Sequence, residues 1–181
     1  MKHNELFPQF LIEGTVRTIQ EISDPQIPSM NCQISGDTIQ IICHPRFPRH
    51  HYYRNAVKEI RKVLIRSAKA TILDRVHKAS IKVQKHPQNV FIKFYKSRWG
   101  SCTNNGVLQM NWSLIMAPVF IIDYVAIHEL CHLTHMNHSP HFWQEVKQHA
   151  PDYPESRRWL KQNASMILSL ANWLNDESRS A

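Results

Sequence analysis

His128-Glu129-Leu130-Cys131-His132 places two imidazoles and a carboxylate within five consecutive residues. Residues four apart on an α-helix are surface neighbours, so His128 and His132 can bind one metal ion together if this stretch is helical. Glu129 then lies beside the first ligand, where its carboxylate can take a proton from a metal-bound water. A metal ion lowers the pKa of such a water towards neutrality, and a positioned base completes its activation. The stretch predicts a metal-dependent hydrolytic site built on one helix.

A catalytic zinc site has three protein ligands and a water, so a third ligand is needed. His135 would share the helix face of the first two histidines, but its Cα would lie about 10 Å along the axis from that of His128. One ion cannot bind all three at that separation, so the chain has to leave the helix and return a ligand from another direction. His138 suits this requirement because it follows Met136-Asn137, and asparagine tolerates the left-handed conformation at a helix end.

The spacing of the histidines supports the same choice. Counting from His128, His138 stands at the last histidine of the pattern H-E-x-x-H-x-x-G-x-x-H. His135 stands where that pattern has glycine, so the ligand spacing agrees although the pattern is incomplete. A site with a glutamate ligand would instead use Glu145 or Glu155. The sequence therefore favours His138 and leaves a glutamate ligand as the alternative.

Hydrophobic periodicity and turn residues predict an α+β arrangement around this helix, with a short, mostly antiparallel sheet packed on helices. A chain of 181 residues fits one domain. Residues 1–45 are expected to form an N-terminal extension of short strands, and residues 46–181 the metal-binding domain. A long helix is expected over residues 54–78, where apolar side chains recur at spacings of three and four. These side chains are Val57, Ile60, Leu64, Ala68 and Ile72.

Further elements follow from turn and cap signals. The turn Asn104-Asn105-Gly106 favours antiparallel pairing of the strand that follows it with the preceding strand, over residues 90–96. Ser139-Pro140 is typical of a helix start, since Ser can cap and Pro suits the first helical position. In chain order, the expected elements are strands over 90–96 and 107–112, the metal-binding helix over 117–135, a helix over 140–148, and a last helix around 159–174.

The net charge of +8 is unevenly distributed along the chain. Residues 44–98 carry fifteen Lys or Arg and two acids, whereas the rest of the chain carries seven bases and twelve acids. A basic segment of this kind can attract nucleotides or nucleic acids through their phosphates. The alternative is a solvated helix face whose Lys and Arg tips lie in water.

The composition also bears on the compartment. No window approaches the roughly 18 consecutive apolar residues that a membrane span needs. The first fifteen residues include Lys2, Glu5 and Glu13 and lack an unbroken apolar segment. The four cysteines form no C-x-x-C pair. We therefore expect a cytoplasmic protein with reduced thiols, no secretory signal and no membrane partner.

A second motif precedes the metal-binding stretch: Ser97-Arg98-Trp99-Gly100-Ser101-Cys102. It is similar to the R-W-G-S-C signature of the YgjP-like metallopeptidase family. Other segments follow in the order of that family: 111–112, 114–118, 123–125, 128–133, 137–143, 151–153 and 158–161. The resemblance covers residues 50–162, whereas residues 1–45 and those after 163 match nothing that we can name.

This resemblance implies a small zincin-like domain in which His128, His132 and His138 bind zinc and Glu129 is the catalytic acid and base. It also implies a peptide or protein substrate. The family includes a relative described as a phosphohydrolase acting on UTP, and the related SprT-like proteases act on protein bound to DNA. Three hypotheses follow: a zinc metallopeptidase, a metal-dependent nucleotide phosphohydrolase, and a nucleic-acid-associated protease or binding module.

Two further polar residues have alternative roles. The segment around Arg98 can be structural, with Trp99 in the core and Gly100 in a bulge or tight turn. It can instead line the substrate cleft, where Arg98 would bind a carboxylate, a phosphate or a developing oxyanion. Asp123 is expected as an acid near a helix start, or as the partner of a ligand histidine.

Overall fold

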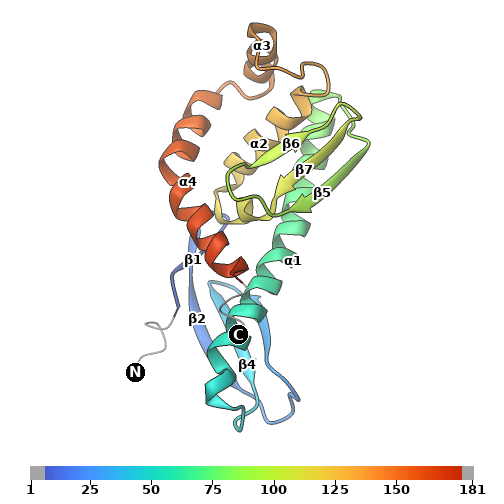
Figure 1. Cartoon of the computed structure of the whole chain (residues 1–181). Helices are drawn as coiled ribbons and strands as arrows, with labels where there is room; N and C mark the ends of the chain where they lie inside the picture. The colour runs from blue at the N-terminus through green and yellow to red at the C-terminus, as the bar shows by residue number, and fades with distance from the viewer. Residues whose placement is uncertain (1–6, 177–181) are drawn as a thin grey trace.

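The computed structural model describes residues 7–176, which form two small sheets and four α-helices (Figure 1). Residues 1–6 and 177–181 lie outside the described residues. They are the two ends of the regions predicted over 1–45 and 46–181. Lys2 and Glu5, which support the expected lack of a secretory signal, are among them. Among the described helices, none combines the length and the apolar character needed to cross a bilayer.

Helix α1 (Arg49–Val83) runs along the length of the molecule and contacts elements at both ends (Figure 1). Its 35 residues span about 52 Å at a rise of about 1.5 Å each. The helix predicted over residues 54–78 is confirmed, and it extends further at both ends because buried side chains continue at the same spacing. The buried series includes Tyr52, Ala56, Ile60, Leu64, Ala68, Ile72, Val76, Ala79 and Val83.

The first sheet packs on the first half of α1, and its order is β1-β2-β4-β3. Its strands are β1 (Phe10–Ile12), β2 (Thr15–Ser23), β3 (Asn31–Ser35) and β4 (Thr38–Cys43). β1–β2 and β3–β4 are antiparallel hairpins, whereas β2 and β4 run parallel. Short strands in this part of the chain were predicted, and the structure has them from residue 10 to residue 43.

The turn of the first hairpin reaches the other half of the molecule. The backbone N–H of Glu13 donates to the carbonyl oxygen of Ile115 at 2.6 Å. Ile115 belongs to the 3-10 helix η2 (Trp112–Met116), which leads directly into the metal-binding helix. The N-terminal strands therefore contact the segment that positions this helix.

The second sheet has the order β5-β7-β6, with β5 (Asn89–Lys93), β6 (Gly100–Cys102) and β7 (Val107–Asn111). β6 and β7 pair antiparallel across the turn that ends at Gly106. The prediction that the strand over 90–96 is the antiparallel partner is wrong, because β6 takes that position across the turn. Gly106 has a φ of 72°, which glycine adopts without strain. β5 pairs parallel with β7 and ends at Lys93, earlier than predicted. Three of the five strand pairings in the two sheets are antiparallel.

Helix α2 (Val119–Cys131) carries the metal-binding stretch and lies between α1, the second sheet and α4 (Figure 1). Nine of its side chains are buried, and they occur on all sides of the helix: Ile121, Ile122, Tyr124, Val125, Ala126, Ile127, Glu129, Leu130 and Cys131. A helix enclosed in this way is apolar all round, so it has no one-sided pattern in the sequence.

The prediction that this helix runs to about His135 is wrong, because α2 ends at Cys131. The backbone N–H groups of Leu133 and Thr134 donate to carbonyl oxygens three residues back, at 3.1 Å each. Bonds of this kind tighten the last turn and stop the helix. His135 therefore lies beyond the helix and does not share a helical face with His128.

Two helices complete the fold. α3 (Pro140–His149) begins as predicted, since the Ser139 Oγ accepts a hydrogen bond from the backbone N–H of Phe142 at 3.3 Å. α4 (Tyr153–Asn175) is one continuous helix that covers the predicted C-terminal helix around residues 159–174. It packs against α2 on the side away from the second sheet (Figure 1).

Candidate metal centre

Three imidazole rings converge at the C-terminal end of α2. His128, His132 and His138 each offer a ring nitrogen, and these atoms all lie within 4.8 Å of one another. The Nε2 atoms of His128 and His138 are 3.1 Å apart. Two nitrogens bound to one tetrahedral zinc ion at about 2.0–2.1 Å would be about 3.3 Å apart. The donor set and its spacing therefore fit one metal ion.

The convergence comes from two different segments. His128 and His132 are four residues apart at the end of α2, so they share one face of that helix. His138 follows the tight turn after the helix and lies just before α3. The Nδ1–H of His132 donates to the carbonyl oxygen of His135 at 2.8 Å. This bond orients the ring and leaves its Nε2 unprotonated and able to bind a metal.

Two aromatic residues of α3 pack on the histidine rings. Phe142 stacks on His132 with a centroid distance of 4.5 Å, and Trp143 stacks on His138 at 5.6 Å. Phe142 is fully buried, so the first turn of α3 is anchored to α2. This packing holds the imidazoles in place.

Burial keeps the helical histidines neutral. Loss of hydration lowers the pKa of His128 to about 3, with the neighbouring His132 and His138 as smaller causes. The pKa of His132 is also lowered, again mainly by burial. A neutral imidazole is the form that binds a metal ion, so both rings are ready to bind at physiological pH.

Glu129 lies beside these rings in an unusual environment for a carboxylate. Its side chain is only 6% exposed, and burial raises its pKa to about 7, while the charge of Arg98 acts in the opposite direction. A Cβ built on Gly100 would lie 2.7 Å from the Glu129 Oε1. Strand β6 thus touches the carboxylate directly, and only glycine leaves room for this contact.

A cleft of about 660 Å³ opens over this group. One wall is the segment from Ser97 to Gly100 beside the second sheet, and the other is α4. The guanidinium of Arg98 lies 4.2 Å from the centroid of the Tyr95 ring. The remaining lining residues are Tyr124, Val125, His128, Glu129, His138, Trp143, Arg157, Leu160, Lys161 and Ala164.

The alternative ligands lie elsewhere. Glu145 pairs with Lys85, and its other oxygen is 3.6 Å from the Nε2 of His135. Glu155 is exposed in the first turn of α4. Asp123 forms two hydrogen bonds with Arg75 of α1 and, within the described residues, none with a histidine, so the alternative in which it partners a ligand histidine is wrong.

The sequence did not single out the α4 wall of the cleft. Arg157 and Lys161 lie 25 and 29 residues after His132, the end of the metal-binding stretch, and only long-range packing brings them to it. Gly100 was considered for a bulge or turn, but its role is the close approach to Glu129. The signature around Arg98 was the one local signal that pointed to this contact.

Comparison with known families agrees with this geometry. The profile of the YgjP-like metallopeptidase domain matches residues 10–163. The chain belongs to the YgjP-like metallopeptidase family. The match begins before the segments that carried the resemblance in the sequence, and it includes the N-terminal strands. As a member of this family, the chain is a metal-dependent hydrolase of peptide bonds.

Two solved structures are similar to about half of this chain. One is the metallopeptidase zymogen of Pyrococcus abyssi abylysin, at 22% identity and a TM-score of 0.45, over 50% of this chain and 93% of that chain. The other is the metallopeptidase zymogen of Methanocaldococcus jannaschii jannalysin, at 22% identity and a TM-score of 0.45, over 51% of this chain and 88% of that chain. No curated protein sequence matches the chain.

Substitution of His138 by Ala should remove bound metal. Loss of one of three ligands should weaken metal binding by more than the roughly 10–100-fold that loss of an outer hydrogen-bond partner costs. His135→Ala is the matched control, since its ring faces Glu145 and its backbone carbonyl remains. Metal content per chain, measured by mass spectrometry, decides between them. Loss of metal from His135→Ala but not from His138→Ala would contradict the assignment.

Substitution of Gly100 by Ala should displace the Glu129 carboxylate while the metal ligands stay in place. A displacement of about 1 Å in a reacting group can lower activity about 100-fold. Ser101→Ala is the control, because side chains alternate along a strand and Ser101 points to the other face of β6. Peptidase activity and metal content are measured together. Full activity of Gly100→Ala would show that the contact does not matter.

Proposed function

We propose that His128, His132 and His138 hold a zinc ion and that Glu129 is the general base for peptide hydrolysis. The observation that supports this most is the convergence of three imidazoles next to a buried carboxylate at the base of a cleft. Imidazole is a preferred zinc ligand, and three protein ligands leave a fourth position for water or substrate. A zinc ion bound here would polarise the scissile carbonyl and lower the pKa of a water.

The residues of the chain have separate tasks in this reaction. Glu129 removes a proton from the attacking water and delivers it to the departing amine nitrogen. A carboxyl with a pKa of about 7 can both accept and release a proton near neutral pH. Arg98, on the wall beside Glu129, is placed to bind the carbonyl oxygen as negative charge develops on it.

Strand β6 is suited to binding the peptide backbone. It is an edge strand of the second sheet, and its first residue, Gly100, lines the cleft next to Glu129. An extended peptide can add to such an edge through main-chain hydrogen bonds. We infer that the substrate binds as an additional strand beside β6, which would align its scissile bond with the histidines.

The four cysteines support a cytoplasmic location. All are free thiols: Cys32, Cys43, Cys102 and Cys131. Proteins that fold in oxidising compartments tend to use cysteines in disulfides, whereas cytosolic proteins keep them reduced. We infer that the chain folds and acts in a reducing compartment.

Replacement of Glu129 by Gln should abolish peptidase activity but not zinc binding. The amide cannot accept the proton of the water, and general base catalysis contributes about 10²–10⁴-fold. Glu155→Gln is a matched control, since this carboxylate is exposed and outside the cleft. Cleavage of an unstructured protein library, analysed by mass spectrometry, measures the effect. A zinc-loaded Glu129→Gln protein that cleaves at the wild-type rate would refute the mechanism.

We also propose a contact with nucleic acid, which one surface of α1 supports. Exposed basic side chains follow one face of this helix at spacings of four and three: Arg54, Lys58, Lys62, Arg66 and Lys69. The face extends about 22 Å at about 1.5 Å per residue. Within residues 7–176, Lys62 forms an ion pair with Glu59 and the other four form none. A row of cations, most of them unpaired, can follow a phosphate backbone without reading its sequence.

Charge reversal on this face should abolish binding to DNA or RNA oligonucleotides. The variant carries Glu at Arg54, Lys58, Arg66 and Lys69, and Lys147→Glu with Arg158→Glu is the control for exposed bases elsewhere. For double-stranded DNA, the logarithm of the affinity should fall with the logarithm of salt concentration with a slope of about −0.9 per phosphate contact. Fluorescence anisotropy measures both effects. If the wild-type protein does not bind oligonucleotides at low salt, this face of α1 is not a nucleic-acid-binding surface.

A further inference from the structure

The cleft has positive charge on both of its walls. Arg157 and Lys161 line it from α4, and Arg98 lines it from the opposite side. Glu129 is the one acidic side chain among the described residues that line the cleft. Within residues 7–176, none of the three cations forms an ion pair with a carboxylate.

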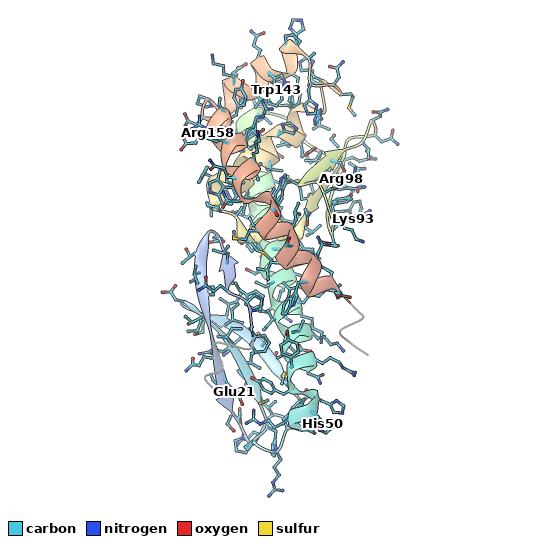
Figure 2. All side chains as sticks on the ribbon, turned by 60° about the vertical axis from the view of Figure 1, so that its left-hand side comes forward. Glu21, His50, Lys93, Arg98, Trp143 and Arg158 are labelled. Carbon is cyan, nitrogen blue, oxygen red and sulfur yellow. The ribbon has the colours of Figure 1, made fainter. Side chains whose placement is uncertain are left out.

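The two cations of α4 lie on one face of their helix. They are four residues apart, which makes them neighbours on the helix surface. Like charges at this spacing destabilise a helix, so the pair is better explained by a ligand than by helix stability. Arg158 is adjacent in sequence but does not line the cleft. Figure 2 shows Arg98 and Arg158 on opposite sides of α4.

Arg157 is also held in place. Its guanidinium lies 4.6 Å from the centroid of the Trp143 ring. Trp143 in turn stacks on His138, with a centroid distance of 5.6 Å and an angle of 23° between the rings. A series of packed groups thus leads from the candidate metal ligand to the guanidinium. A group bound by Arg157 would lie close to a substrate bond held at the histidines.

We propose that Arg157 and Lys161 form a carboxylate-binding subsite, so that the enzyme prefers peptides with an acidic group next to the scissile bond. This inference rests on the proposed peptidase function. Arginine binds a carboxylate through two parallel N–H bonds, and lysine adds a mobile point charge. The carboxylate can be an Asp or Glu side chain, or the free C-terminus of the peptide. Either carboxylate would bind to Arg157 and Lys161.

The test is direct binding to the zinc-loaded Glu129→Gln protein, which keeps peptides intact. Three fluorescent peptides of one sequence are compared: neutral with an amidated C-terminus, amidated with one internal Glu, and neutral with a free C-terminus. At least one carboxylate peptide should bind about tenfold more tightly than the neutral peptide, and the difference should shrink with added salt. The peptide that gains affinity identifies the source of the carboxylate.

Variants of the two cations locate the subsite. Lys161→Gln should reduce the preference, and Arg157→Gln with Lys161→Gln should remove it. Arg158→Gln is the matched control on the same helix and should leave the preference unchanged. Lys161→Gln makes the test independent of Trp143, since Arg157 alone packs on that ring. Metal content of each variant, measured in parallel, shows whether the histidines still bind zinc.

The outcomes are distinct. Equal affinity for all three peptides, or no binding at all, would overturn the proposal. A nucleoside triphosphate that binds more tightly than every peptide, and that loses affinity in the same variants, would assign the subsite to phosphate and also overturn it. Failure of wild-type protein to cleave any peptide would count against the proposed function alone, because the binding preference is measured without turnover.

Discussion

The burial of α2 is the constraint on which the rest of the structure depends. α1, the second sheet and α4 enclose this helix, and the same enclosure removes water from His128 and Glu129. Loss of hydration disfavours charge in both groups, so it lowers the pKa of the imidazole and raises that of the carboxyl. Packing thus keeps the His128 imidazole neutral and brings the pKa of the Glu129 carboxyl near neutrality, as the proposed metal ligand and base require. A helix with one side in water would provide neither.

The third histidine has to reach the other two from outside the enclosed helix, and the turn after α2 makes this possible. A straight continuation of α2 would carry His135 away from the other rings. The helix instead stops at Cys131, and the carbonyl of His135 accepts the Nδ1–H of His132. The same turn brings the Nε2 of His138 to 3.1 Å from the Nε2 of His128. One short segment therefore ends the helix, orients one ring and supplies another.

The sequence predicted what depends on local spacing and missed what depends on packing. The four-residue spacing of His128 and His132 and the axial rise of a helix were enough to favour His138 over His135. The end of α2, the parallel pairing of β5 and the approach of Gly100 to Glu129 depend on contacts between distant segments. Arg157 and Lys161 of α4 could not be predicted as cleft residues for the same reason. No local pattern indicates which face of a solvent-exposed helix lines a cleft.

The N-terminal strands pack on α1 and contact the segment that leads into α2. Their sheet covers the first half of α1, whose buried Ala56, Ile60 and Leu64 would otherwise form an exposed apolar patch. The hydrogen bond from Glu13 to Ile115 connects the same strands to the segment that enters α2. Since α1 packs on both this sheet and α2, support for the sheet and support for the histidines come from one continuous helix. The segment that leads into the histidines is therefore in contact with residues more than one hundred positions earlier in the chain.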